Sequence, residues 1–221
     1  MVVYTALFGN HKDQLRTPVN QIHQADLDFY AFVDKDVADV HDPSIERPWK
    51  IMPPYFDEPN ARRRARAHKL LAHKLFPEEE YWLWVDGTLQ IICSDLLELI
   101  SKHLSKVDIC VFRHFERSCL FGEVSACVRA DKDDLHTMAT QVSHYRKEGY
   151  PTQNGLGETS ALLRRNTKNV REFNELWWTQ LKNGSVRDQL SFDYVAWKLK
   201  IKYAVFEGTS FDNKNFKLFI H

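Results

Sequence analysis

Asp86 is the residue whose type and neighbours most favour chemistry. It follows the apolar run 81–85 and precedes Gly87 and Thr88. An acid that leaves an apolar strand on a small, flexible turn allows the backbone to approach a ligand closely. A carboxylate in that position is a good ligand for Mg²⁺ or Mn²⁺, because hard cations take oxygen donors and leave positions open for phosphate oxygens. The same acid could simply cap a tight turn, and this segment alone leaves both interpretations open.

A row of cationic residues precedes this acid in the sequence. Arg62, Arg66 and Lys69 are spaced i, i+4 and i+7, which puts them on one face of a helix. His73 lies four residues beyond Lys69, and Arg63 lies close to the same face. Next to a metal, such a row could neutralise a diphosphate leaving group. Taken alone, the row is more typical of a solvated basic helix face.

Two later polar segments flank one predicted helix. Asn154, Gly155 and Glu158 precede an apolar stretch, and Asp188 and Gln189 stand near a helix start. The first segment offers a loop with close backbone approach and an acid. An Asp at a helix N-terminus is most often a cap. The functional interpretation therefore gains weight only from the two segments together.

Four further side chains are weaker candidates. His114 and Glu123 belong to a polar cluster after a predicted strand, where each alone is typical of a surface or ion-paired position. Trp178 could stack on a sugar ring, but adjacent aromatic residues in a helix point in different directions, so either Trp177 or Trp178 should pack in the core. His221 is the final residue, and a terminal His is usually disordered.

Short apolar strands that alternate with helices must position these side chains. Strands are expected over 2–8, 28–34, 49–52, 81–86, 108–113 and 159–163, and helices over 60–76, 94–104 with Ser94 as N-cap, 132–149, 170–183 and 188–198. This alternation predicts an α/β fold: a single Rossmann-like domain over residues 1–221, with a mixed, mostly parallel sheet and helices on both faces. A ligand of such a sheet normally lies beyond the carboxyl ends of the strands. Gly9, Asp34, Asp86 and Arg113 fall there.

Composition limits the class of protein further. Of the 221 residues, 43% are hydrophobic and 27% charged, which excludes a disordered or low-complexity chain. The 30 Lys and Arg balance 30 Asp and Glu, so no global positive charge favours a nucleic acid partner. No apolar run approaches the ~18 to 20 residues that span a bilayer, and the N-terminus lacks the pattern of a signal peptide. We therefore expect no transmembrane segment and a cytoplasmic location; the oligomeric state stays open.

With these residues in view, the chain resembles the glycosyltransferase-like family known from plant mucilage and turgor-regulation proteins, formerly a domain of unknown function. The resemblance covers nearly the full length, and its motifs are specific together although each is weak alone. They are Val3 to Gly9, Arg66 with Lys69, His73 to Pro77, Trp84 to Gly87, Arg113 to Glu123, Gly149 to Pro151, Asn154 to Thr159, Trp177-Trp178 and Arg187 to Phe192.

The chain is also similar, more distantly, to retaining GT-A transferases that use nucleotide-sugar donors. In those enzymes an apolar strand ends in Asp-x-Asp, an Asn-x-Gly loop follows, and Asp-Gln opens a late helix. Asp86 matches the first acid, and the pairs Asn154-Gly155 and Asp188-Gln189 match the later signatures. Thr88 stands in place of the second Asp, which departs from a metal site with two carboxylates.

The resemblance implies that a hexose is transferred from a nucleoside-diphosphate sugar to a hydroxyl of a glycan or another acceptor, with retention of configuration. Asp86, with His221 if the tail folds back, would hold Mn²⁺ or Mg²⁺ at the diphosphate. Arg66 and Lys69 would offset the charge that builds up as the glycosidic bond breaks. Asp188 or Glu158 would stabilise an oxocarbenium-like centre.

The remaining substrate contacts implied by the resemblance are spread along the chain. Thr5, Phe8, Gly9 and Asp34 would cradle the base and ribose, Asn154 would contact the transferred sugar, and further contacts are expected from Arg63, His73, His114, Gly155, Gln189 and Trp178.

Two other functions compete with this one. The first is a metal-dependent hydrolase in which Asp86, His73, His114 and Glu123 activate water. No H-E-x-x-H or similar ligand spacing supports it. The second is a non-catalytic module of the same fold that binds a sugar or nucleotide, since a fold does not determine a function.

Overall fold

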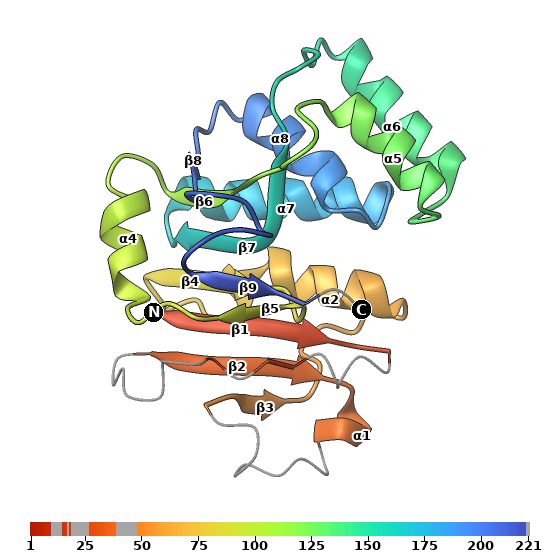
Figure 1. Cartoon of the computed structure of the whole chain (residues 1–221). Coiled ribbons are helices and arrows are strands. Elements are labelled where there is room, and N and C mark those ends of the chain that lie inside the picture. The colour runs from red at the N-terminus through yellow and green to blue at the C-terminus, as the bar shows by residue number, and fades with distance from the viewer. Residues whose placement is uncertain (10–14, 17, 19–26, 39–47, 220–221) are drawn as a thin grey trace.

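A seven-stranded sheet forms the centre of the computed structural model, which describes residues 1–9, 15–16, 18, 27–38 and 48–219 (Figure 1). The strand order is β3-β2-β1-β4-β7-β6-β8. The strands are β1 (Val2–Leu7), β2 (Asp28–Val33), β3 (Lys50–Met52), β4 (Tyr81–Val85), β6 (Ile109–Arg113), β7 (Gly157–Arg165) and β8 (Ala204–Val205). Two short strands, β5 (Leu89–Ile91) and β9 (Phe216–Leu218), pair in a separate antiparallel sheet.

The sheet is mixed and mostly parallel, as predicted. β1 pairs in parallel with β2 and β4, and β2 with β3. Among the described strands of this sheet, β7 alone is antiparallel to its neighbours, β4 and β6, while β8 is parallel to β6. Every residue of β1 is buried, as expected for a strand that is covered on both faces.

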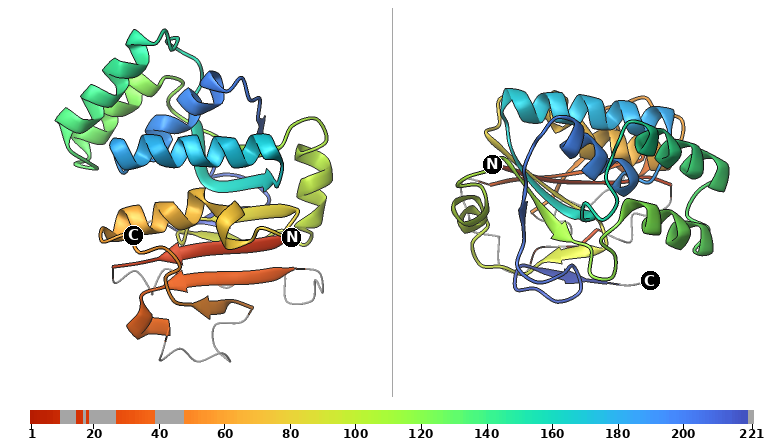
Figure 2. Two further views of the ribbon diagram at one scale, coloured as in Figure 1. Left: turned by 180° about the vertical axis from the view of Figure 1, so that it is seen from behind. Right: turned by 90° about the horizontal axis from the view of Figure 1, so that it is seen from above.

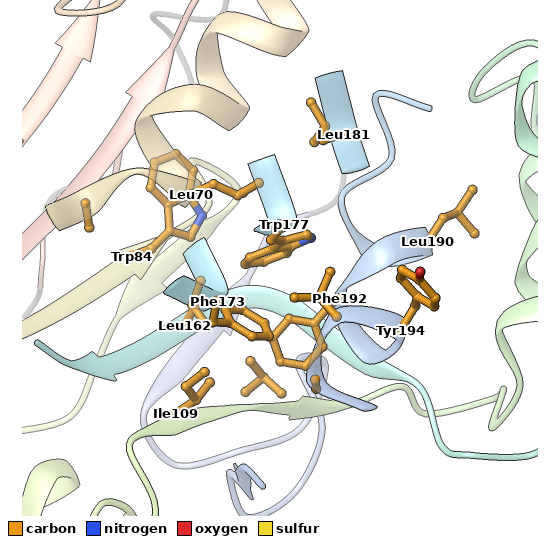
Figure 3. Close-up of a cluster of buried hydrophobic side chains, with 14 of the residues drawn as sticks. Leu70, Trp84, Ile109, Leu162, Phe173, Trp177, Leu181, Leu190, Phe192 and Tyr194 are labelled. Carbon is orange, nitrogen blue, oxygen red and sulfur yellow. The ribbon is translucent and has the colours of Figure 1, made fainter. Parts of the chain in front are cut away.

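Helices cover both faces of the sheet (Figure 2). On one face lie α2 (Ala61–Leu70), α7 (Lys168–Asn183) and α8 (Gln189–Lys198), and Trp84, Phe173, Trp177 and Phe192 are among the side chains that form the core there (Figure 3). On the other face, α4 (Leu97–His103) and the β5–β9 pair enclose a second core. The predicted two-sided arrangement is therefore confirmed.

Four more helices complete the described part of the chain: α1 (Lys35–Ala38), α3 (Ala72–Leu75), α5 (Leu120–Arg129) and α6 (Leu135–Lys147). The pair α5 and α6 stands at one end of the molecule beside α8 (Figure 1). The sequence analysis did not predict α5, because its first turn falls within the polar cluster that ends at Glu123. None of the helices in the described ranges is long and apolar enough to cross a membrane.

The helix predicted over 60–76 is divided at Leu71, which has φ −95° and ψ 39°. The cause lies on β7. Arg164 is fully buried and donates to the carbonyl oxygens of Lys69 at 2.6 Å and of Leu70 at 3.0 Å. Carbonyls in the last turn of a helix have no partner within the helix, so this guanidinium stabilises the end of α2 at that point.

The predicted N-cap of the helix over 94–104 is wrong. Asp95 accepts hydrogen bonds from the backbone N–H groups of Leu97 at 2.8 Å and Glu98 at 3.2 Å, and α4 begins at Leu97. Ser94 and Asp95 are both good capping residues, so the sequence pattern alone could not choose between them.

Candidate active site

The carboxyl ends of β1 and β2 are joined by side-chain contacts. Gly9, with φ +77°, donates its backbone N–H to Asp34 Oδ2 at 2.7 Å. The other oxygen of Asp34 lies 3.2 Å from the Arg64 guanidinium. A Cβ at Gly9 would lie 3.3 Å from Ala61 Cβ, so the turn after β1 lies directly against the start of α2.

A first cavity, of about 340 Å³, opens between the turn after β1, α2 and the end of β4. Among the described residues, four cationic side chains and a single carboxylate, Asp86, line it. The cations are Arg62, Arg66, Lys132 and Arg187. Such an excess of positive charge suits an anion with several oxygens, since Arg and Lys bind phosphate groups through charge-assisted hydrogen bonds. Phe8 and Gly9 line the same cavity.

A second cavity, of about 290 Å³, adjoins the first, because Arg66, Asp86 and Arg187 line both. Its other residues are Lys69, His114, Phe115, Arg117, Glu123, Glu158, Thr159, Ser160, Asp188, Gln189 and Phe211. Residues of α2, the loop after β6, α5, β7, the start of α8 and the chain after β8 therefore meet around one cavity.

Lys69 and Asp188 form the buried centre of this second cavity. Lys69 is 1% exposed, and its Nζ lies 2.6 Å from Asp188 Oδ2 and 3.5 Å from Asp86 Oδ1. It also donates to Thr159 Oγ1 at 3.0 Å. Arg66 Nε lies 3.0 Å from the other oxygen of Asp188. Both oxygens of Asp188 are thus engaged by cations, as a buried charge requires.

The charges of this network determine its protonation. Burial by itself would raise the pKa of Asp188, but Arg66 and Lys69 outweigh it and hold that pKa well below its usual range. Burial would lower the pKa of Arg66, yet Asp188 and Asp86 raise it overall. The site therefore carries ionised groups at neutral pH.

Backbone contacts hold both members of the central pair in place. The carbonyl of Lys69 accepts hydrogen bonds from Tyr4 Oη at 2.8 Å and from Arg164. Trp177 Nε1 donates to the carbonyl of Asp188 at 2.9 Å. Buried core residues therefore hold the backbone of both residues.

Asp86 both closes a turn and lines the two cavities. Its carbonyl accepts from Leu89 N at 2.8 Å, and its Oδ1 accepts from Trp84 Nε1 at 2.6 Å. Among the described residues no group of three or more His, Cys, Asp and Glu side chains could hold a metal ion. A single carboxylate nevertheless fits Mg²⁺, which commonly takes one or two carboxylates together with substrate phosphates.

His114 lies at the wall of the second cavity as a neutral ring. Its Nδ1 accepts the backbone N–H groups of Glu116 at 3.2 Å and Arg117 at 3.1 Å. Burial, and then the nearby Arg117, lower the pKa of His114. Arg117 also pairs with the buried Glu123, so His114 and Glu123 serve a common structural cluster.

Glu158 and Gln189, which line the second cavity, each have a buried polar atom without a hydrogen-bond partner among the described residues. Glu158 accepts from Ser160 Oγ through Oε1 at 2.9 Å, but its buried Oε2 is unpaired. Gln189 is 7% exposed, and its Nε2 is also unpaired. Buried polar atoms without partners are costly, which marks both as places for a ligand group.

Several residues named by the sequence analysis lie elsewhere. Asn154 and Gly155 line a different cavity, of about 670 Å³. His73, on α3, contacts Glu175 at 3.0 Å. Neither cavity described above includes these residues. The four residues of the hydrolase alternative thus do not meet within the described part of the chain.

Four other residues predicted to contact the substrate lie outside the two cavities and contact the protein itself. Thr5 is buried in β1, Arg63 donates to the carbonyl of Gly184 at 3.3 Å, and Trp178 packs half-buried against the core. Asp34 fastens Gly9 instead of lining the first cavity. His221 lies outside the described residues.

Several residues that the fold brings to the two cavities were not expected from the sequence. Arg187 precedes Asp188 directly, and this adjacency was a usable signal. Lys132, Phe115 and Phe211 had no expected role, and only the tertiary structure brings them to the site. Arg164 gave no signal because, next to Arg165, it looks like the polar end of the strand predicted over 159–163.

The fold and this site together define a glycosyltransferase-like protein. Mouse xyloside xylosyltransferase 1 in its apo form superposes with a TM-score of 0.53 at 12% identity, over 89% of this chain and 81% of that one. The bifunctional glycosyltransferase WbbM, also apo, gives 0.55 at 11% identity, over 93% of this chain and 38% of that one. At these identities the likeness concerns the fold alone, and it confirms the predicted GT-A-like class.

The chain belongs to the TOD1/MUCI70 glycosyltransferase-like domain family, whose model matches residues 1–221. The family resemblance seen in the sequence is thereby confirmed. Two Arabidopsis thaliana relatives, the probable hexosyltransferase MUCI70 and the alkaline ceramidase TOD1, are each 27% identical over 91% and 96% of this chain. The chain spans 38% and 52% of their respective lengths.

Proposed function

We propose that this protein transfers a hexose from a nucleoside-diphosphate sugar to an acceptor hydroxyl. The main support is the pair of adjoining cavities, which share Arg66, Asp86 and Arg187. One cavity is rich in cations, and the other contains carboxylates. A donor that spans both would place its diphosphate among the cations and its sugar beside Glu158 and Asp188. The hexosyltransferase named among the relatives supports this assignment.

In this proposal the first cavity binds the nucleotide. Arg62, Arg66, Lys132 and Arg187 contact the diphosphate, while Phe8 and Gly9 lie beside the base and ribose. Asp86, with diphosphate oxygens and water, would hold Mn²⁺ or Mg²⁺, which when bound supplies further positive charge at the leaving group. His221 is a candidate further ligand.

In the transfer step, charged side chains stabilise the charges that develop on the nucleotide and on the sugar. The bond between the anomeric carbon and the diphosphate oxygen breaks, and Arg66 stabilises the negative charge on the departing nucleotide. The acceptor oxygen bonds to the anomeric carbon, and its proton passes to the departing phosphate oxygen. Glu158, whose Oε2 is unpaired, faces the positive charge of the sugar, while Asp188 positions Lys69 and Arg66. Retention of configuration is proposed from the family resemblance, and an inverted product in NMR would contradict it.

A thermal-shift screen tests the nucleotide site. UDP, GDP and ADP, and their sugars, are added with and without Mn²⁺ to wild type, Asp86→Ala, Lys132→Ala and the control Asp57→Ala, an exposed acid outside both cavities. A ligand that binds only the folded state raises the melting temperature. We expect one nucleotide to raise the melting temperature of wild type and Asp57→Ala equally. The rise should be smaller in Lys132→Ala, and in Asp86→Ala it should not depend on Mn²⁺. No shift with any nucleotide would contradict the proposal.

The ceramidase name of the second relative suggests another activity to exclude. Incubation with a ceramide, followed by detection of free fatty acid, measures amide hydrolysis directly. Fatty acid release without nucleotide binding would replace the transferase proposal by a hydrolase. A nucleotide sugar that binds but is never consumed with any acceptor would instead favour a binding module.

A further inference from the structure

Two phenylalanines at the second cavity are unusually exposed for their size. Phe115, from the loop after β6, is 49% exposed, and Phe211, from the loop between β8 and β9, is 51% exposed. Their ring centroids are 4.5 Å apart with planes at 64°, an edge-to-face pair. Exposed rings forgo the stabilisation of burial, and a cluster of them beside a cavity is typical of a binding surface.

The loop that carries Phe211 is rigidly built. Gly208 has φ +78°, and a Cβ there would lie 2.2 Å from the carbonyl oxygen of Asp212. Thr209 N donates to that same carbonyl at 2.9 Å, and Asp212 N donates to Thr209 Oγ1 at 3.1 Å. Asn213 Oδ1 accepts two further backbone N–H groups. The turn thus presents Phe211 outward instead of allowing it to fold inward.

Phe115 is braced as well. The ring of His114 stacks on it, with centroids 5.3 Å apart and planes at 9°. His114 is in turn held by its backbone bond to Leu156 at 2.9 Å and by the two N–H groups that its Nδ1 accepts. The aromatic pair is therefore preorganised, and ordering it on binding would cost little entropy.

The same cavity offers unpaired polar atoms next to the rings. Gln189 Nε2 and Glu158 Oε2 are buried and have no hydrogen-bond partner among the described residues. One is a donor and the other an acceptor. Apolar rings combined with a few convergent polar groups match a pyranose, which has C–H groups on its ring faces and hydroxyls around its edge.

We propose that Phe115 and Phe211 form the acceptor platform, on which the terminal pyranose of a glycan acceptor stacks with its hydroxyl edge toward Gln189 and Glu158. The inference rests on the proposed function and deepens it, because it names the acceptor class. A lipid chain is the less suitable occupant, since the cavity is only about 290 Å³ and contains several charged side chains.

The test measures sugar binding and nucleotide binding separately. Saturation-transfer difference NMR with methyl β-glycosides of xylose, glucose and galactose is recorded, with octyl glucoside below its micelle concentration as the lipid-like probe. The variants are Phe115→Ala, Phe211→Ala, Phe211→Leu and Phe211→Trp. Tyr55→Ala is the matched control, because Tyr55 is 63% exposed and lies outside both cavities.

We expect at least one methyl glycoside to bind wild type and the Tyr55→Ala control equally. Phe211→Ala and Phe115→Ala should weaken it by about fivefold or more, the effect of losing one aromatic stacking contact. Phe211→Trp should keep the affinity, and Phe211→Leu should not, because stacking needs a π face. All variants should keep the nucleotide thermal shift of wild type.

Three results would overturn the platform. The first is that no methyl glycoside binds wild type, and the second is that Phe211→Ala binds the glycoside as tightly as wild type does. The third is that Phe211→Leu keeps the full affinity and the protein prefers octyl glucoside, which would indicate a lipid acceptor. Failure of the proposed function is distinct, because it would appear as the absence of any nucleotide shift in wild type, whatever the glycosides do.

Discussion

Lys69 is a lysine that the protein buries almost completely, and Asp188 is the group that makes this possible. A buried ammonium is stable only with a close counter-charge and hydrogen bonds, and Lys69 has Asp188, Asp86 and Thr159 around it. Arg66 adds a second cation on the far oxygen of Asp188. Asp188, at 2.6 Å, is the closer of the two carboxylates that hold the central cation of the site.

Replacing Asp188 by Asn should destabilise the fold at neutral pH. Two cations would lose their partner, and breaking a buried pair costs about 3–5 kcal/mol. The pKa of Asp188 is depressed in the folded state, so its contribution is complete above the unfolded pKa of about 4 and is lost as the pH falls toward the lower folded pKa. Urea unfolding should show a difference between wild type and Asp188→Asn at pH 7 that shrinks below about pH 4. A difference independent of pH would contradict this account.

At the scale of elements, the end of α2 is decided by β7. Arg164 reaches from the strand to the last carbonyls of the helix and also contacts Asn174 of α7 at 2.6 Å. Burial lowers the pKa of this guanidinium. One buried side chain thus joins a strand and two helices at the point where Lys69 must be held.

Arg164→Met should lower the free energy of unfolding by about 3 kcal/mol or more, because the buried carbonyl of Leu70 and the side-chain oxygen of Asn174 lose this donor. The neighbouring Arg165→Met is the matched control. Arg165 is partly exposed and pairs with Asp108 at 2.9 Å, so its loss should cost about 1 kcal/mol or less. Equal effects of the two substitutions in chemical denaturation would refute the bracing role of Arg164.

His68 joins α2 to the segment after β3 in a way that requires a neutral ring. Its Nε2 accepts the backbone N–H of Tyr55 at 3.0 Å, and its Nδ1 lies 2.8 Å from the carbonyl oxygen of Arg64. One nitrogen must accept and the other donate, which a neutral imidazole does. Burial lowers the pKa of His68 from 6.5 to about 4.

Stability should therefore fall as the pH drops from about 6.5 to about 4, since only the unfolded chain binds the proton of His68 in that window. The full effect amounts to about 3 kcal/mol. Other histidines contribute in the same range, so the measurement is the difference between wild type and His68→Gln across this window. A difference that does not change with pH would show that His68 is not buried as a neutral ring.

At the scale of the whole molecule, the sheet and α8 close on each other at Gly157, the first residue of β7. Its backbone N–H donates to the buried Asp193 at 2.7 Å. A Cβ there would lie 2.8 Å from the ring of Phe192. Phe192 belongs to the core on the sheet face that α2, α7 and α8 cover. The close packing of α8 on β7 thus leaves no room for a side chain at position 157.

Gly157→Ala should destabilise the protein by about 1–3 kcal/mol through overpacking. Gly122→Ala is the contrasting control, because a Cβ in that helical position of α5 meets nothing within 4 Å. That control should be neutral or stabilise by about 0.5–1 kcal/mol, as expected for alanine in a helix. Equal melting temperatures for the two variants would contradict the close approach of α8 to β7.

The strand alternation and the motifs were sufficient for the fold class and the family. Buried strands such as 81–85 are short apolar runs that end in polar turns, and this signal is local, so it survives without tertiary information. The helical spacing of Arg62, Arg66 and Lys69 is local in the same sense, and the first two line the first cavity while Arg66 and Lys69 line the second.

Local pattern could not determine which distant polar residues meet. Asn154 and Asp188 looked alike as loop and cap residues, yet only Asp188 contacts Lys69, because the path of the chain between β7 and α8 decides this. Phe211 and Lys132 reach the site from loops whose positions depend on long-range packing. The sequence by itself therefore determined the class of fold and one cationic helix face, whereas the tertiary structure alone decided the membership of the site, since contacts between remote segments form only when the layers pack.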